Sequence, residues 1–216
     1  MMTTNKLTKT FASGSLAIGV LAGSVFAATS ASAAILDWAT WTGGTPLENG
    51  DKKVTFVSEN GFGADPLDDV ELTEMGGHYY FIYDATTPDS PDPNINNSGS
   101  FTYTIEVINS NKSIVGVDLD SDVSSDYGTV TETFVEIPNV LVSDNGSAVP
   151  PSGFIPIPDH KLLTVTNTLS NPGSPNEALF QFQNSFRQTT VPEPGTILGL
   201  LTVGGLGLVS RFKKQK

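Results

Sequence analysis

The chain has 216 residues, with 23 acidic and 11 basic side chains and no cysteine. Without thiols it forms no disulfide, thiolate zinc site or iron–sulfur cluster, and a cysteine nucleophile is excluded. Between residues 34 and 190 there are 22 acidic and five basic residues, a formal charge of −17. Because that charge repels nucleic acid and anionic lipid, we expect neither as a partner of this part of the chain.

Residues 1–33 have the pattern of a secretory signal peptide. Lys6 and Lys9 precede an apolar run over residues 11–28, and the small residues Ala31 and Ala33 then match the preference of signal peptidase. Cleavage is predicted before Ala34, with signal peptidase as a processing partner. A permanent N-terminal transmembrane helix is the alternative, but the Ser, Gly and Ala content and the lack of a charged stop disfavour it.

Residues 34–190 are predicted to form one all-β domain, an antiparallel β-sandwich or jelly roll. The clearest strand is 101–107, where Phe101, Tyr103, Ile105 and Val107 alternate with polar residues. The same period-two pattern occurs over 163–169 and over 180–186, where Phe180, Phe182 and Phe186 are expected on one face. Weaker strands are predicted at 54–59, 79–84, 114–120, 129–137 and 140–143, with turn-rich loops between them and no convincing helix.

Two acidic stretches are candidate metal sites. Asp118, Asp120 and Asp122 alternate along a predicted strand with Asp126 just beyond, and alternating carboxylates suit Ca²⁺. The run departs from an EF-hand loop because Val123 and Thr129 stand where its glycine and bidentate glutamate belong. Structural calcium and a solvated acidic strand face are the two interpretations. A second cluster, which reads equally well as a surface loop, comprises Asp65, Asp68, Asp69, Glu71 and Glu74.

The remaining side chains suggest binding more than catalysis. The loop over residues 86–99 is long enough to bind a ligand, although a simple surface loop is the commoner explanation. Trp38, Trp41, Tyr79 and Tyr80 are either core residues or, if exposed beside carboxylates, a sugar platform. His78 and His160 lack zinc-site spacing, and no nucleophile elbow or P-loop is present, so we expect no enzyme.

The last 26 residues, 191–216, read as a membrane-directed tail. Pro192, Glu193 and Pro194 precede 15 uncharged residues, five of them glycine, and a basic end formed by Arg211, Lys213, Lys214 and Lys216. A helix of 15 residues is about 22 Å long, which is short against a hydrocarbon core of about 30 Å. We predict one transmembrane helix with a cytoplasmic basic stop.

This order of motif, apolar segment and basic end resembles the PEP-CTERM protein-sorting signal of exported Gram-negative and cyanobacterial proteins. The resemblance covers residues 191–216 only and implies recognition by an exosortase, a membrane-embedded enzyme that cleaves near Pro192, Glu193 and Pro194. An ordinary tail anchor behind a proline-rich linker is the alternative.

Both ends of the chain therefore indicate an exported protein, held in the membrane by its C-terminal helix before it reaches the cell surface or the medium. The hypothesis is a structural or adhesive component of an exopolysaccharide matrix or biofilm. The alternative is a secreted carbohydrate-active protein, either a lectin or a glycan hydrolase. Structural calcium is the one cofactor considered, and extracellular polysaccharide is the expected partner.

Overall fold

The structure is a computed structural model that describes residues 33–95, 98–149, 153–170 and 177–189. The predicted apolar core of the signal peptide, the sorting signal and the predicted C-terminal helix lie outside these residues, so they stay predictions. Ala34, the first residue after the predicted signal-peptidase site, is also the first residue of strand β1.

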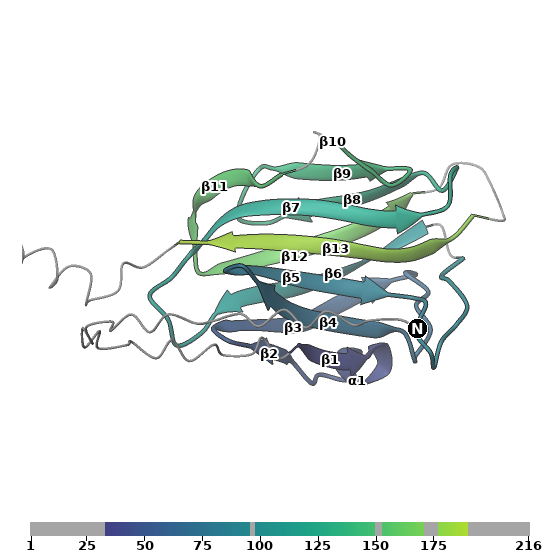
Figure 1. The fold of residues 1–216 in the computed structure, drawn as a ribbon, viewed down its shortest axis with the longest axis horizontal. Helices are drawn as coiled ribbons and strands as arrows, with labels where there is room; N and C mark the ends of the chain where they lie inside the picture. Colours follow the sequence, from purple (N-terminus) through teal and green to yellow (C-terminus); the bar gives the residue numbers. More distant parts are fainter. Residues whose placement is uncertain (1–32, 96–97, 150–152, 171–176, 190–216) are drawn as a thin grey trace, which may run out of the picture. The chain divides into compact units, whose positions relative to one another are not determined.

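Two antiparallel sheets make up the described body (Figure 1). We name them sheet A, in the order β1-β4-β5-β13-β7-β11, and sheet B, in the order β10-β9-β8-β12-β6-β3-β2. The elements are β1 (Ala34–Asp37), α1 (Trp38–Thr42), β2 (Leu47–Asn49), β3 (Lys52–Asn60), β4 (Asp69–Met75), β5 (His78–Asp84), β6 (Ser98–Val107), β7 (Ile114–Val123), β8 (Thr129–Phe134), β9 (Val140–Asp144), β10 (Ser147–Val149), β11 (Ile155–His160), β12 (Leu162–Ser170) and β13 (Leu179–Gln188).

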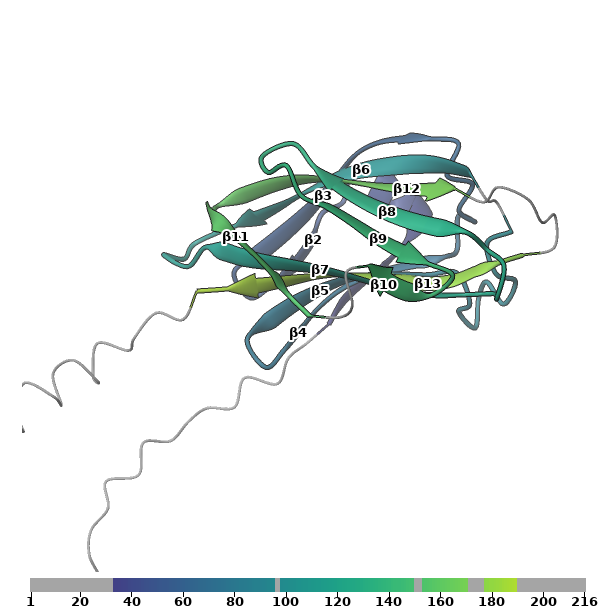
Figure 2. The same cartoon turned by 90° about the horizontal axis from the view of Figure 1, so that it is seen from above.

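The two sheets pack face to face as two layers (Figure 2). Side chains from both inner faces form one core, in which aromatic rings from sheet A, such as Phe81 and Phe182, contact rings from sheet B, such as Phe101 and Tyr103. Polar contacts also cross between the sheets, since Asn184 donates to Asn167 at 3.0 Å. The all-β prediction is therefore confirmed, and the arrangement is that of a sandwich.

The period-two pattern places the clearest strands correctly. In β6 the four predicted inward residues are buried, and β12 buries Leu163, Val165 and Leu169 in the same way. In β13 the pattern holds for Phe182 and Phe186 but not for Phe180, which is only half-buried. The pairing of β13 with β7 shifts register between Leu179 and Gln181, so the extra residue turns Phe180 off the inner face.

Several elements were not predicted. Strand β4 falls in the stretch that was interpreted as an acidic cluster, yet Val70 and Leu72 alternate with its acids and are fully buried. Strands β1, β2, β10 and β11 are short or rich in proline, and prolines weaken any strand signal. Helix α1 has five residues, too few for an apolar period, and begins where the Asp37 carboxylate accepts from the Thr40 amide at 2.7 Å.

Candidate functional site

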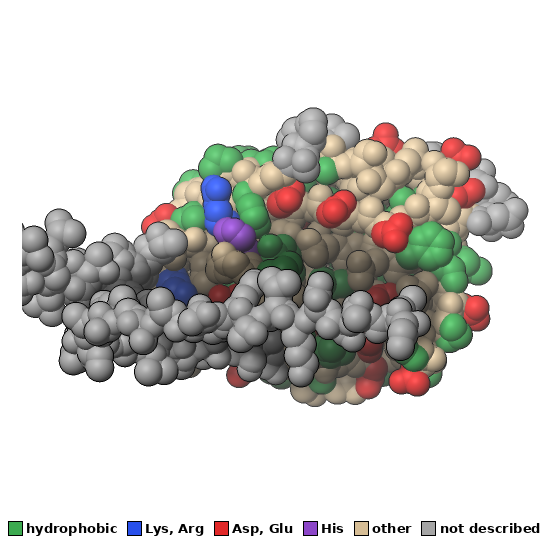
Figure 3. All heavy atoms as spheres, in the orientation of Figure 1, with side chains coloured by type: hydrophobic (Ala, Val, Ile, Leu, Met, Phe, Trp, Pro, Cys, Tyr) green, Lys and Arg blue, Asp and Glu red, His purple; other side chains and the backbone are tan. Residues whose placement is uncertain are grey.

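The predicted calcium residues lie on the outer surface of sheet A. Asp118, Asp120 and Asp122 are paired in register with Ser185, Gln183 and Gln181 of β13, the central neighbour of β7. Further acids continue the rows across β5, β4 and β1. Figure 3 shows acidic side chains as separate red groups on this side of the body. We call this surface the acidic face: Asp37, Asp69, Glu71, Asp84, Asp118, Asp120 and Asp122.

The acidic face does not bring its carboxylates together as a metal site. Within the described ranges, no three Asp, Glu or His side chains are grouped so that they could hold a metal ion. Alternate residues of an extended strand stand about 6.6 Å apart, and Asp126 lies in the turn after β7, where its amide donates to Glu177 at 3.3 Å. Burial, followed by repulsion from neighbouring carboxylates, raises the pKa values of Asp69 and Glu71.

The second acidic cluster divides into two parts. Asp69, Glu71 and Glu74 belong to β4, whereas Asp65 and Asp68 lie in the preceding loop. That loop meets residues 86–95, part of the predicted binding loop, and together they line a hollow of about 660 Å³. The sequence analysis therefore singled out residues on both sides of the hollow, but it did not indicate that the two segments face each other.

Asp68 joins the two walls. Its carboxylate is 1 % exposed and accepts from the hydroxyls of Tyr83 at 2.5 Å and Ser90 at 2.8 Å, and from the Asp65 amide at 2.8 Å. Burial raises the pKa of Asp68, although these three hydrogen bonds oppose the shift. A fully hydrogen-bonded buried carboxyl of this kind positions loops rather than binding ligands itself.

Loss of the Asp68 carboxylate should loosen the hollow. We expect Asp68→Ala to lower the free energy of unfolding by about 1–3 kcal/mol, because Tyr83 and Ser90 lose a buried acceptor. Limited proteolysis should then cut residues 61–95 faster than in the unchanged protein. Asp92→Ala, in the same hollow but outside this network, is the control, and equal cleavage rates in both variants would contradict the role given to Asp68.

The hollow itself is acidic and partly apolar. Asp65, Asp89 and Asp92 are exposed on it, Leu67 and Ile95 expose 51 % and 71 % of their surface, and no Lys or Arg is among its lining residues. At about 660 Å³ it is much larger than the hollow of about 110 Å³ between β7 and β13, which Asp120 and Gln183 line.

The tryptophans are core residues. Trp38 and Trp41 are 5 % and 0 % exposed, and their rings lie 5.4 Å apart at the centre of the aromatic core. Tyr79 is also buried, and only Tyr80 reaches the acidic face. The sugar platform considered from the sequence therefore does not form from these rings.

The histidines do not meet. His78 is in β5 and packs against Phe154 at 4.8 Å, whereas His160 ends β11, which β13 and β7 separate from β5 in sheet A. No catalytic pairing of these two side chains follows.

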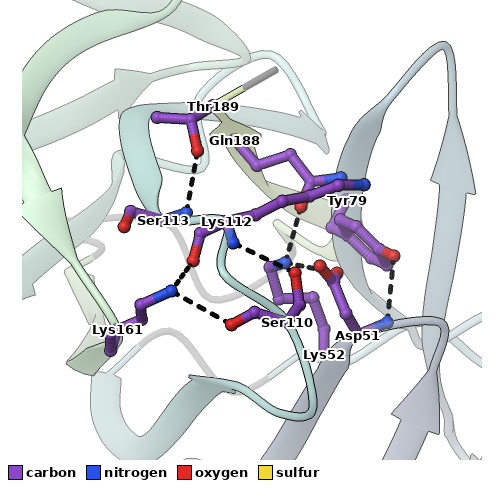
Figure 4. A network of polar contacts seen from close by, with 9 residues as sticks. All are labelled: Asp51, Lys52, Tyr79, Ser110, Lys112, Ser113, Lys161, Gln188 and Thr189. Carbon is purple, nitrogen blue, oxygen red and sulfur yellow. Dashed lines mark hydrogen bonds and ion pairs between the residues drawn. The ribbon is translucent and has the colours of Figure 1, made fainter. Parts of the chain in front are cut away.

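Sequence reasoning missed a buried cation. Lys52, the first residue of β3, is 0 % exposed; its Nζ donates to Asp51 Oδ1 at 2.6 Å and to Gln188 Oε1 at 2.8 Å, and lies 4.4 Å from the centre of the Tyr79 ring (Figure 4). Burial lowers the pKa of Lys52, and the Asp51 carboxylate only partly offsets this effect. Gly50, with φ of +56°, lets the turn before Asp51 pass close to the Tyr79 hydroxyl, to which the Asp51 amide bonds at 3.3 Å.

A second buried polar group occupies the sandwich core. Glu132 of β8 is 0 % exposed, and neither carboxyl oxygen has a hydrogen-bond partner. Asn167 pairs with it in register on β12, and Tyr103 and Asn184 complete the group from β6 and β13. Burial raises the pKa of Glu132 well above its usual range.

The body is thus an acidic two-sheet sandwich, and no group of side chains that could hold a metal ion is found among its described residues. The family model for the PEP-CTERM protein-sorting motif matches residues 190–214, which confirms the resemblance stated from the sequence. The motif implies an exported, surface-directed protein that an exosortase processes. No curated protein matches the chain, and no helix among the described residues is long and apolar enough to span a membrane.

Proposed function

We propose that this chain is a structural or adhesive, non-enzymatic component of the cell surface or extracellular matrix, associated with exopolysaccharide. The observation that carries the proposal is the sorting motif at residues 190–214, directly behind an acidic sandwich. Export and sorting would bring the protein to the cell surface, and the outer faces of its two sheets are broad enough to contact a polymer.

The outer surface of sheet B favours an uncharged polymer. Rows of threonine run across its strands in register, for example Thr55, Thr104 and Thr164, or Thr102, Thr166 and Thr133. We call this surface the threonine face: Thr55, Thr102, Thr104, Thr131, Thr133, Thr164, Thr166 and Thr168. Hydroxyls both donate and accept hydrogen bonds, and the threonines themselves carry no charge, although the Glu136 carboxylate accepts from the Thr164 hydroxyl at 2.8 Å. The array therefore suits a neutral polysaccharide better than an ionic partner.

The acidic hollow supports the alternative function, a secreted lectin or glycan hydrolase. Concave sites with a few polar groups beside apolar surface are the usual form of small-ligand sites. Asp65, Asp89 and Asp92 beside Leu67 and Ile95 give this combination. Such a site would bind the end of a glycan chain, whereas the threonine face would contact a polymer along its length.

One experiment separates these functions. The purified full chain should co-sediment with the exopolysaccharide of the producing cells, and no reducing sugar should appear. Thr102→Asp together with Thr166→Asp should abolish co-sedimentation, and Thr73→Asp, on the already acidic face, should not. Release of sugar would establish the hydrolase instead, and failure of the unchanged protein to co-sediment would reject the matrix role.

Sorting is tested independently in the producing cell. We expect mass spectrometry of the surface and medium fractions to find a chain that lacks both the first 33 residues and the apolar tail. Replacing Pro192, Glu193 and Pro194 with alanine should leave the tail in place and hold the protein in the membrane fraction. If the unchanged protein keeps residues 195–216, the tail is a plain anchor.

A further inference from the structure

Lys52 is more deeply buried, and has more polar partners, than a lysine in a simple ion pair requires. Its side chain is fully enclosed, although lysine is almost never fully buried because its ammonium group is strongly hydrated. The two groups that enclose its Nζ are a carboxylate, Asp51, and a side-chain amide, Gln188, which is itself only 8 % exposed. The ring of Tyr79 covers the same Nζ (Figure 4).

An amine, an amide carbonyl and a carboxylate within hydrogen-bond distance are the groups that amide transfer requires. The amine is the nucleophile, the amide carbon is the electrophile, and the carboxylate moves the proton. Because the fold holds the three groups in fixed positions, the reaction between them is intramolecular, and their effective concentration is far higher than for free molecules in solution. Water, the competing nucleophile, has little access to a lysine that is 0 % exposed.

We propose that Lys52 and Gln188 form an intramolecular isopeptide bond, with Asp51 as the proton carrier. Lys52 Nζ gives a proton to Asp51 Oδ1 through their 2.6 Å hydrogen bond, and the neutral amine attacks the Gln188 side-chain carbonyl carbon. A carbon–nitrogen bond forms, Asp51 returns the proton to the amide nitrogen, and the carbon–nitrogen bond to that nitrogen breaks. Ammonia leaves and takes up the remaining proton as ammonium, so the reaction needs no oxidant or cofactor.

The surroundings favour Lys52 as the nucleophile, whereas they hold the pKa of Asp51 below its usual range, because burial is outweighed by hydrogen bonds from Lys52 and Ser110. Because burial lowers the pKa of Lys52, a larger share of its amine is neutral and nucleophilic than in water. Tyr79 keeps its proton, since burial raises the pKa of its phenol. Its hydroxyl oxygen accepts from the Asp51 amide at 3.3 Å, which helps to hold Asp51 beside the amine.

The position of the bond suits an exported protein. It would join β3 of sheet B to β13 of sheet A, residues that are 136 apart in the sequence. Gln188 also lies two residues before the sorting motif. Tension applied through the C-terminal end would pass into sheet B through a covalent bond rather than through the last strand alone. In a chain without cysteine, this linkage takes the place of a disulfide.

Peptide mapping of the purified full chain tests the proposal. We expect a branched peptide that joins the segments containing Lys52 and Gln188 and is lighter than the two linear peptides together by one ammonia. The branched peptide is decisive rather than the intact mass, because the Asn145–Gly146 pair can also lose ammonia on its own by closing to a succinimide.

Variants assign the roles. Lys52→Met and Gln188→Met should each abolish the branched peptide, whereas Lys53→Met, which changes the neighbouring lysine, should leave it unchanged. Asp51→Asn keeps both reacting groups and should slow formation of the branched peptide by on the order of a hundredfold. The rate is measured over time, and near-ultraviolet circular dichroism of the same protein checks that its core is folded. If the folded, unchanged protein yields linear peptides for Lys52 and Gln188 and no branched peptide, the proposal is overturned. If the branched peptide forms as fast in Asp51→Asn as in the unchanged protein, Asp51 is not the proton carrier.

Discussion

Trp41→Ala is expected to lower the free energy of unfolding by about 3–5 kcal/mol, the range for removing a large aromatic side chain from a core. The Trp41 ring is 0 % exposed and lies 5.3 Å from both Phe56 and Phe81, so it contacts rings of both sheets. Its indole nitrogen has no hydrogen-bond partner, so the loss would come from packing alone. Urea unfolding followed by the fluorescence of Trp38 measures it.

Trp41→Phe is the matched variant, since it keeps a ring in the same space and should lose less than half as much. Tyr80→Ala, on the acidic face, is the surface control and should change the free energy of unfolding by about 0.5 kcal/mol or less. A loss below 1 kcal/mol for Trp41→Ala would mean that the two sheets do not depend on this ring.

The sequence predicted the fold class and the longest strands because their signal is local. Phe101, Tyr103 and Ile105 alternate with threonines because only one face of the strand is buried, and this alternation can be seen in the sequence alone. The same logic was available in β4, where Val70 and Leu72 alternate with acids, but the density of carboxylates suggested a loop. The tryptophans were identified as core candidates from composition alone, and their burial agrees with that interpretation.

The site-level features were not predictable in the same way because they depend on long-range contacts. Lys52 and Gln188 meet across 136 residues of sequence, and nothing local marks either of them. Asp68 and Ser90 likewise join two loops whose contact depends on the packing of β4 and β5. In contrast, the sorting motif is a contiguous linear signal, so it could be identified without any structure.

Glu132 makes the stability of the sandwich depend on pH. In the unfolded chain its carboxyl ionises near its usual pKa of about 4.3, whereas burial in the folded core raises the pKa well above that. Above the unfolded pKa the folded state holds a proton that the unfolded state has lost. This contribution to stability is complete below the unfolded pKa, and it falls by up to about 1.4 kcal/mol per pH unit until the folded pKa is reached.

Glu132→Gln should remove this dependence. An amide cannot ionise, and its NH₂ group can donate to the unpartnered Oδ1 of Asn184. We therefore expect little change in the free energy of unfolding at pH 4 and a gain of at least about 1 kcal/mol at pH 8, measured by urea unfolding across the pH range. Glu106→Gln, on the exposed side of β6, is the control and should leave the pH profile as it is. An unchanged profile in Glu132→Gln would show that the carboxyl is ionised and solvated in the folded protein, and that this part of the core is open to water.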